Sequence, residues 1–411
     1  MARLLLLGGS VAQLPLVHTA HRIGLDVAVA DARPDAPGMA AADTAVAISS
    51  LDHEALVAWA SRHPVDGVLT VGSDRAVVVV ARVASALRLP GLSIATALLA
   101  SDKAAMRDRF DRAGVPCPRW RPSRSVEEAL GVAADLGYPV IVKPSDNAAQ
   151  RGVALATDEL DLRTRAEQAL AESPSRTLLV EEVADGPEYT ANTLTLGGST
   201  TVVTLTERLT TPPPFPGIAL GHVYPAGLTP DREADVVGAA LAAVRALGID
   251  DSPGYTQVRL TAGGPRVIET AARLGGGCDA LLAKLVTGID LEEAVVRLAL
   301  GQAPAVAHPR AGLGPYEAGC SLFAVDGCGG FVEAIVGLDE ARRLPGLHDV
   351  QAYFRPGQVV PAAISGEARR VHAVAGGHSR EEALSRARRA LATAQVLVRD
   401  NPADRYVREE G

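Results

Sequence analysis

The alternation of apolar and polar residues predicts a parallel α/β domain at the start of the chain. Short apolar runs occupy residues 4–7, 27–30 and 67–71, and helical segments separate them. Strands that alternate with helices in this way usually form a parallel sheet. Residues 1–95 are therefore expected to form one domain of this kind.

The later part of the chain contains capped helices and strands that end in charged residues. Ser101 is predicted to be the N-cap of a helix that stops at Gly114. Ser379 and Glu382 have the spacing of a capping box, which predicts a last helix at residues 379–398.

The segment at residues 267–277 carries the densest chemistry. An apolar strand runs into Glu269, Arg273 follows four residues later, and Gly275, Gly276 and Gly277 come next. A carboxylate at a strand end can bind Mg²⁺, and an arginine can hold a phosphate or a developing oxyanion. Glycines allow backbone N–H groups to approach an anion. Taken alone, the segment also fits a buried strand followed by an ordinary loop.

Two lysines upstream stand where an anion could be bound. Lys103 lies in the first turn of its helix, where a cation opposes the helix dipole. It is either a solvated surface lysine or a lysine that meets an anion. Lys143 ends an apolar strand, and the polar segment 145–152 after it could fold over phosphates, although it is not a Walker A loop.

A further strand, residues 178–180, leads into a group of acids. Glu181 and Glu182 follow it directly, and Glu188 comes after a turn. Charged residues at a strand end can simply be solvated. Their order along the chain relative to the two lysines also allows a functional interpretation.

These four motifs, in this order and at these separations, resemble the ATP-grasp superfamily over nearly the whole chain. The resemblance implies an α/β ATP-grasp fold with a Rossmann-like N-terminal domain and a C-terminal α+β domain like that of biotin carboxylase. The expected domains are residues 1–95, 96–305, with a lid subdomain at about 119–197, and 306–411. Asp31 could bind a ribose in a dinucleotide fold, but the resemblance implies no dinucleotide site there.

The resemblance also implies ATP and Mg²⁺ (or Mn²⁺) as cofactors and a role for each matching residue. Lys103 and Lys143 would contact the phosphates, and residues 145–152, including Ser145 and Gly152, would cover the triphosphate. The adenine and ribose would be bound by Glu181, by the backbone of Glu182, Val183 and Ala184, and by Glu188. Glu269 would bind the metal, and Arg273 would stabilise the acyl phosphate and the tetrahedral intermediate.

Two positions depart from the family's pattern at the metal site. A three-residue hairpin loop would place Gln257 opposite Glu269, where the family usually has a second acid. Ala271 stands where an asparagine is frequent. The expected metal ligands are therefore Glu269 and Gln257, with the number of ions left open. An inactive enzyme that still binds nucleotide is one alternative.

The composition of the chain narrows the classes of function that are possible. The chain has 411 residues, 47% hydrophobic content and a net charge of −8. No basic stripe interleaved with aromatic residues is present, which argues against nucleic-acid binding. The four cysteines form no Cys-x-x-Cys pair, which argues against zinc. Cys278 is either close to a substrate or a buried structural thiol.

The location expected from the sequence is the cytoplasm. The apolar run at residues 4–7 is too short for a signal peptide, and no run is long enough to span a membrane. Membrane partners are not expected. The resemblance suggests a homodimer and small-molecule carboxylate and amine substrates.

Within the superfamily, the segment 221–226, the glycine triplet and the C-terminal region look most like L-amino-acid (dipeptide) ligases. Such an enzyme would be an ADP-forming ligase that joins a carboxylate to an amine through an acyl phosphate. His222 is either a substrate contact, together with Gly275 and Gly276, or an ordinary buried histidine. These ligases often have an acidic residue at the position of Ala219. We therefore expect an unusual acid substrate, such as one that gives a γ-glutamyl product. A purine-pathway or carboxylase-type enzyme is the other catalytic alternative.

Overall fold

The computed structural model describes residues 1–147, 150–212, 217–304, 314–325 and 329–400. The chain divides into two compact units. The first unit comprises Met1–Pro118, Ala184–Leu205 and Leu228–Leu313, and the second comprises Arg119–Val183, Thr206–Gly227 and Gly314–Gly411. The division into three domains expected from the sequence stays a prediction.

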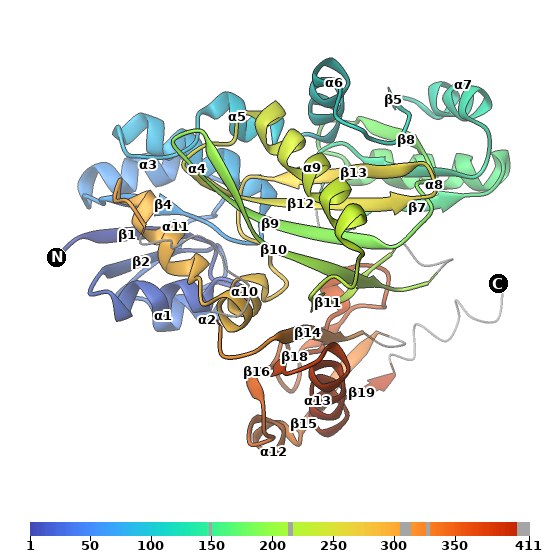
Figure 1. Ribbon diagram of the computed structural model, residues 1–411. Helices are drawn as coiled ribbons and strands as arrows, with labels where there is room; N and C mark the ends of the chain where they lie inside the picture. The colour runs from blue at the N-terminus through green and yellow to red at the C-terminus, as the bar shows by residue number, and fades with distance from the viewer. Residues whose placement is uncertain (148–149, 213–216, 305–313, 326–328, 401–411) are drawn as a thin grey trace. The chain divides into compact units, whose positions relative to one another are not determined.

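The first unit begins with a parallel four-stranded sheet, drawn in blue in Figure 1. Its strands, in the order β3-β2-β1-β4, are β1 (Arg3–Leu7), β2 (Asp26–Ala30), β3 (Thr44–Val46) and β4 (Gly67–Leu69). The helices of this region are α1 (Leu14–Arg22), α2 (Pro37–Ala41), α3 (His53–Arg62), α4 (Asp74–Leu87) and α5 (Ile94–Leu99). The parallel α/β arrangement predicted for the start of the chain is confirmed.

Alternate residues of the central strands bury opposite faces of this sheet. Leu4 and Leu6 pack with residues of α1 and of α11 (Leu291–Ala299). Leu5 and Leu7 pack with residues of α3 and α4 on the other face. Because strand side chains alternate between faces, a run of consecutive leucines can serve both cores.

The rest of the first unit is an antiparallel sheet with helices. The strands β9 (Glu188–Leu196), β12 (Ser252–Thr261) and β13 (Gly264–Ala271) are hydrogen-bonded in the order β13-β12-β9. The helices here are α6 (Lys103–Ala113), α9 (Pro230–Leu247) and α10 (Asp279–Thr287). Strand β10 (Ser199–Thr210) begins in this unit and ends in the second.

The second unit contains a small four-stranded sheet, in the order β5-β8-β6-β7. Its elements are β5 (Trp120–Ser123), α7 (Val126–Leu136), β6 (Val140–Pro144), β7 (Ala154–Ala156), α8 (Glu159–Glu172) and β8 (Leu178–Glu182). Alanines of α7 and α8 pack with Val140, Val142 and Val180 in its core. This sheet carries the predicted phosphate lysine and the predicted adenine acid.

The second unit also contains the C-terminal region. Strands β11 (Ala219–Tyr224), β14 (Ala318–Ala324), β18 (Val371–Gly377) and β16 (Leu347–Ala352) run antiparallel in that order. Helix α13 (Arg380–Thr393) covers one face with its alanines. The remaining elements are β15 (Gly330–Val336), α12 (Leu338–Arg342), β17 (Val359–Val360), the 3₁₀ turn η1 (Gly366–Ala368) and β19 (Gln395–Asp400).

The predicted last helix is right at its start and wrong at its end. Ser379 Oγ accepts the N–H of Glu382, as a capping residue should. The helix ends at Thr393, and residues 395–400 form β19, which pairs with β15. The short apolar run of Val396, Leu397 and Val398, with two β-branched residues, fits a strand better than a helix. No helix in the described part of the chain combines the length and apolar character that crossing a membrane requires.

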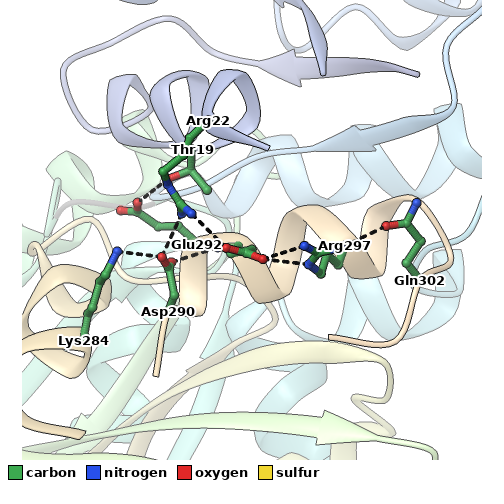
Figure 2. Close-up of polar contacts among 8 residues, drawn as sticks. Thr19, Arg22, Lys284, Asp290, Glu292, Arg297 and Gln302 are labelled. Atoms are coloured by element: carbon green, nitrogen blue, oxygen red, sulfur yellow. Dashed lines mark hydrogen bonds and ion pairs between the residues drawn. The ribbon is translucent and has the colours of Figure 1, made fainter. Parts of the chain in front are cut away.

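A polar network joins α1 to the start of α11 within the first unit (Figure 2). Thr19 Oγ1 donates to Glu292 Oε2 at 3.0 Å. Arg22 donates to Asp290 at 2.9 Å and to Glu293 at 3.0 Å. Burial raises the pKa of Glu292, and the neighbouring Asp290 adds to this, although the Thr19 hydroxyl lowers it.

We predict that Glu292→Gln stabilises the protein at alkaline pH. A carboxyl whose pKa is raised on folding makes ionisation costly to the folded state, and this cost grows as pH rises from the unfolded to the folded pKa. Glutamine keeps an acceptor for Thr19 and carries no charge. The melting temperature should rise by roughly 2 °C at about pH 8 and by less at about pH 5. An equal gain at both pH values would contradict this prediction.

Candidate functional site

The hairpin of β12 and β13 carries the two predicted metal ligands. Gln257 lies opposite Glu269, so the predicted pairing is confirmed. The loop differs from the expected one, because Thr261 pairs with Gly264 across a two-residue turn. Val258 pairs with Val267, so the register shifts by one residue between Gln257 and Val258. The extra residue, Ile268, forms a β-bulge that compensates for the shorter turn.

An arginine of α6 holds the bulged strand. Arg107, which is buried, donates from one terminal nitrogen to Val267 O at 2.9 Å and from the other to Ile268 O at 2.8 Å. Strand β13 ends its sheet, so these carbonyls need a partner outside the sheet. Sequence reasoning missed Arg107, although it stands one helical turn after Lys103 and on the same face of the helix.

Lys103 begins helix α6 and lies beside the bulge. Its Nζ is 3.6 Å from Glu269 Oε2. The prediction of Lys103 in a first helical turn is confirmed, but Ser101 is not the N-cap. Asp102 caps the helix through the N–H of Ala105, and the Ser101 hydroxyl donates to the carbonyl of Asp74. Two adjacent residues could cap, and the one with the carboxylate does so.

Arg273 is held from the start of α4. Its Nε lies 2.8 Å from Asp74 Oδ1, and its guanidinium lies over the ring of Tyr255 at 5.2 Å. Burial lowers the pKa of Arg273, but the charges of Asp74, Tyr255 and Glu269 outweigh it, so the pKa is raised. Arg273 therefore remains charged in its buried position. Sequence reasoning missed Asp74, whose partner lies 199 residues away.

Of the two glycines predicted to contact substrate, Gly275 is required by the packing around it. A Cβ at Gly275 would overlap Asp279 and the ring of Tyr255, so only glycine fits there. Gly276 has ordinary space around it, next to Gly72. The N–H of Gly277 donates to Asp279 at 3.2 Å. Anion binding by this segment stays a prediction.

A second arginine that sequence reasoning missed holds the predicted ribose acid. Arg259 lies opposite Glu188 on β12, and its Nε donates to Glu188 Oε2 at 3.2 Å. A terminal nitrogen of Arg259 also donates to Ala184 O and Gly186 O, both at 3.4 Å. One side chain thus contacts both Ala184, the last residue of the predicted adenine segment, and the buried Glu188. An arginine opposite the acid in the neighbouring strand is the only sequence signal for this contact.

In the second unit, Lys143 and Glu181 form a buried ion pair. Their side chains are 6% and 4% exposed, and Lys143 Nζ lies 2.7 Å from Glu181 Oε2. Adjacent strands bring them together, since Glu181 of β8 lies opposite Ile141 of β6. The next acid, Glu182, pairs instead with Arg119 at 2.6 Å. The adenine and phosphate roles of these residues stay predictions.

The described residues of the predicted phosphate loop are tied to their surroundings. The buried Ser145 donates its N–H to Thr177 O at 2.9 Å. Gly152 has a φ of +71°, and a Cβ there would lie 2.8 Å from Pro144 Cγ, so glycine is required. Residues 148–149 of this segment lie outside the described residues. Coverage of a triphosphate by this loop stays a prediction.

His222 is buried in β11 of the second unit. Its Nδ1 lies 3.3 Å from Thr206 Oγ1, and it stands opposite Arg208 on one neighbouring strand and Ser321 on the other. The carbonyl of nearby Ala219 accepts from Arg369 at 3.2 Å. Burial with a hydrogen-bond partner fits both expectations for His222, so its substrate role stays a prediction.

The donor set around Glu269 fits a magnesium ion that is held mainly by phosphate. Within the described ranges, no three His, Cys, Asp or Glu side chains are grouped so as to hold a metal. Glu269 and Gln257 offer one carboxylate and one amide oxygen on facing strands. Mg²⁺ commonly takes one or two protein oxygens together with substrate phosphates, so these residues suit a nucleotide-bound ion.

Three family models match successive parts of the chain. The model described as the ATP-grasp N-terminal domain matches residues 17–91. The ATP binding domain of the carbamoyl-phosphate synthase L chain matches residues 102–305. The L-amino acid ligase C-terminal domain 2 matches residues 323–399. The chain belongs to the ATP-grasp superfamily of ATP-binding ligases.

Its particular similarity is to L-amino acid ligases, in agreement with the sequence motifs. The crystal structure of an L-amino acid ligase from Bacillus licheniformis has a TM-score of 0.80 and 25% sequence identity, and the match covers 97% of this chain and 99% of that chain. The predicted ATP-grasp fold and the predicted resemblance are therefore confirmed.

Two further proteins are also similar to this chain. The biotin carboxylase domain of the Hydrogenobacter thermophilus 2-oxoglutarate carboxylase, solved as a dimer with MgADP and bicarbonate, has a TM-score of 0.77. At 19% identity over 96% of this chain and 90% of that chain, it shows the fold alone. The uncharacterized protein y4rH of Sinorhizobium fredii is 30% identical over 282 residues. The match covers 68% of this chain and 57% of that relative.

We predict that Arg107→Lys weakens ATP binding. Lysine lacks the planar fork that donates one N–H to each bulge carbonyl in a fixed geometry, so Glu269 and Lys103 lose their common support. The dissociation constant for Mg²⁺-ATP should rise about tenfold, which is a little over 1 kcal/mol. Titration calorimetry measures it, and Arg112→Lys, an exposed change on the same helix, is the control. Equal affinities of the two variants would contradict the role given to Arg107.

We also predict that Lys143→Met destabilises the second unit. The carboxylate of Glu181 would remain buried without its lysine, at a cost of about 3 kcal/mol in the free energy of unfolding. Lys143→Met combined with Glu181→Gln should recover most of this loss, because no buried charge is then left behind. Urea unfolding of the two variants compares them directly. A double variant less stable than the single one would contradict the prediction.

Proposed function

We propose that this protein is an ATP-dependent, ADP-forming ligase that joins the carboxylate of one amino acid to the amine of another. The observation that carries the proposal is the similarity to the Bacillus licheniformis L-amino acid ligase over nearly the whole of both chains. The match of residues 323–399 to an L-amino acid ligase domain supports it independently of the ATP-binding region.

Each unit would contribute to the nucleotide through residues whose positions are already fixed. In the first unit, Lys103 and Glu269 would meet the phosphates and the metal, while Glu188 would accept hydrogen bonds from the ribose hydroxyls. In the second unit, Lys143 would contact phosphate, and Glu181 would lie near the adenine. Magnesium, held by Glu269 and Gln257, would neutralise phosphate charge.

The proposed reaction has two steps and needs no nucleophile from the protein. A carboxylate oxygen of the first substrate attacks the γ-phosphorus of ATP, and ADP leaves, which gives an acyl phosphate. The amine of the second substrate then attacks the acyl carbon, loses a proton, and expels phosphate as the amide forms. Positioning and charge neutralisation supply the catalysis in such a mechanism.

Arg273 would stabilise the charge that develops on the acyl oxygen. Its guanidinium is charged and held by Asp74, with Tyr255 beneath it, so little reorganisation would be needed during the reaction. The charge of Glu269 also contributes to the raised pKa of Arg273, which supports assigning related roles to the two residues.

A carboxylase-type reaction is the second candidate. The Hydrogenobacter thermophilus structure contains MgADP and bicarbonate, and it shares this chain's fold. Such an enzyme would release ADP only when bicarbonate is supplied. Dependence on bicarbonate or formate would likewise mark a purine-pathway enzyme. A protein that binds ATP without turnover would release no ADP with any substrate.

The test is ADP release from Mg²⁺-ATP across a matrix of amino-acid pairs, with mass spectrometry of the products. We expect ADP together with a product whose mass equals two amino acids less one water. ADP release that depends on bicarbonate would favour the carboxylase-type reaction. Binding of ATP without ADP release in every mixture would overturn catalysis altogether.

We predict that Arg273→Lys lowers kcat by about 100-fold and changes the dissociation constant for ATP by less than about twofold. Lysine keeps the charge but cannot hold Asp74 and the acyl oxygen together in a fixed plane. Steady-state kinetics and calorimetry separate the two effects. A large loss of ATP affinity with unchanged kcat would contradict the oxyanion role.

A further inference from the structure

A pocket in the first unit lies along the outer edge of β4. This strand is at one end of its parallel sheet, where no further strand of the described chain pairs with it. Three consecutive residues of β4 and its end, Val68, Leu69 and Thr70, line the pocket. Because successive strand residues point to opposite faces, a pocket that meets all three lies beside the strand. It is therefore placed between the two hydrophobic cores that flank the sheet.

The walls of the pocket are mainly aliphatic. Helices α4 and α11 both contact β4 and both line the pocket (Figure 1). Its volume is about 570 Å³, counting the part that is open to solvent. The aliphatic side chains that line it include Leu69, Val77, Val80, Leu92, Val295 and Leu298. Small-molecule sites usually measure about 300–1,000 Å³ and are mostly apolar, so this pocket suits a small ligand with an alkyl body.

Four polar residues also line the pocket, and three of them are already engaged within the protein. Thr70 Oγ1 and Ser252 Oγ each donate to a backbone carbonyl, at 2.8 Å and 3.2 Å. The guanidinium of Arg273 pairs with Asp74 at 2.8 Å, which compensates its charge. These three residues therefore leave the fourth, Asp251, to decide which charge a ligand would carry.

Asp251 brings a negative charge to the rim of the pocket. It is exposed, and its Oδ1 accepts the N–H of Gly197 at 3.1 Å. Within the part of the chain that the structure describes, its other oxygen has no hydrogen-bond partner and no cation pairs with it. Aliphatic walls with an unpaired carboxylate at the rim complement a ligand that has an alkyl body and a cationic end.

The pocket adjoins the segment that carries Arg273. Residues 272–274 form one part of its lining. Val77 and Val80, on another side, belong to α4, whose first residue, Asp74, holds Arg273. A ligand in the pocket would therefore pack against both elements that set the position of Arg273. The other described residues assigned to the nucleotide or the metal do not line it.

We propose that this pocket is a binding site for a small aliphatic amine. The alkyl part of the ligand would fill the space between α4 and α11, and its ammonium group would lie at Asp251. The site is additional to the proposed nucleotide site, and binding to it does not depend on the proposed ligase reaction.

Ligand-observed NMR titration at neutral pH, without nucleotide, tests the proposal with isoamylamine, isoamyl alcohol and isovalerate. These probes share their alkyl group and differ in charge. We expect a dissociation constant of roughly 1 mM for isoamylamine and about threefold weaker binding of the alcohol, because an exposed carboxylate contributes a modest attraction. A preference for isovalerate would place the charge of the ligand at Arg273 and overturn the proposal. The absence of measurable amine binding would overturn it as well.

A change in the wall locates the bound amine. Val80→Phe should fill the pocket and weaken the binding of isoamylamine by at least about tenfold. Val78→Phe is the matched control, since Val78 is half-buried on the same helix but does not line the pocket, and it should bind like the wild type. Equal binding by the two variants would place the amine elsewhere, for example at the proposed amine-substrate site, and overturn the proposal. Thermal melts establish that each variant is folded, and Leu298→Phe blocks the pocket from α11 if Val80→Phe is not.

A change at the rim tests the ammonium contact. Asp251→Asn should remove the preference for the amine over the alcohol and leave the affinity for the alcohol unchanged. Asparagine keeps an acceptor for Gly197 and tolerates the φ of +43° at this position. Asp250→Asn is the control, because Asp250 accepts a backbone N–H in the same turn and does not line the pocket. A preference that both variants lose equally would show that Asp251 does not select the amine, and would overturn the proposal.

Discussion

The register of β13 against β12 is the constraint on which the first unit's site depends. One extra residue at Ile268 brings Gln257 opposite Glu269, and Arg107 binds the carbonyls of Val267 and Ile268 at that point. A one-residue slip would send Glu269 to the other face of the sheet. The same arginine fastens α6, and therefore Lys103, beside the carboxylate. The bulge, helix α6 and Lys103 are therefore held in fixed positions relative to one another.

Charge pairs hold several of the candidate site residues within each unit. Arg273 is set by Asp74, Arg259 sets Glu188, and Lys143 lies against Glu181. Taking these groups out of water is costly unless each meets an opposite charge. Apolar residues of similar size would often stabilise the fold as well as such pairs do. On this account ATP exchanges some of these contacts for its own.

The sequence predicted most of the elements and a set of candidate site residues, whose roles stay predictions, but it missed the side chains that hold those residues in place. The strand ends at Lys143 and Glu181 were readable because apolar runs stop there. The pairing of Gln257 with Glu269 was predicted from a three-residue turn, but the structure reaches it through a two-residue turn and a β-bulge. Arg107, Asp74 and Arg259 were missed because their partners lie 160, 199 and 71 residues away. The end of α13 was misplaced because a short apolar strand follows the helix without a glycine or proline between them.

The central claim is that the protein transfers phosphate from ATP to a carboxylate before an amide forms. An amino acid labelled with ¹⁸O in the carboxylate that reacts tests this claim most directly. Mass spectrometry of the released phosphate should find one labelled oxygen for each ADP, because the acyl phosphate keeps a carboxylate oxygen when the amine displaces it. Phosphate without label, released together with ADP, would contradict the account and indicate attack on ATP by water.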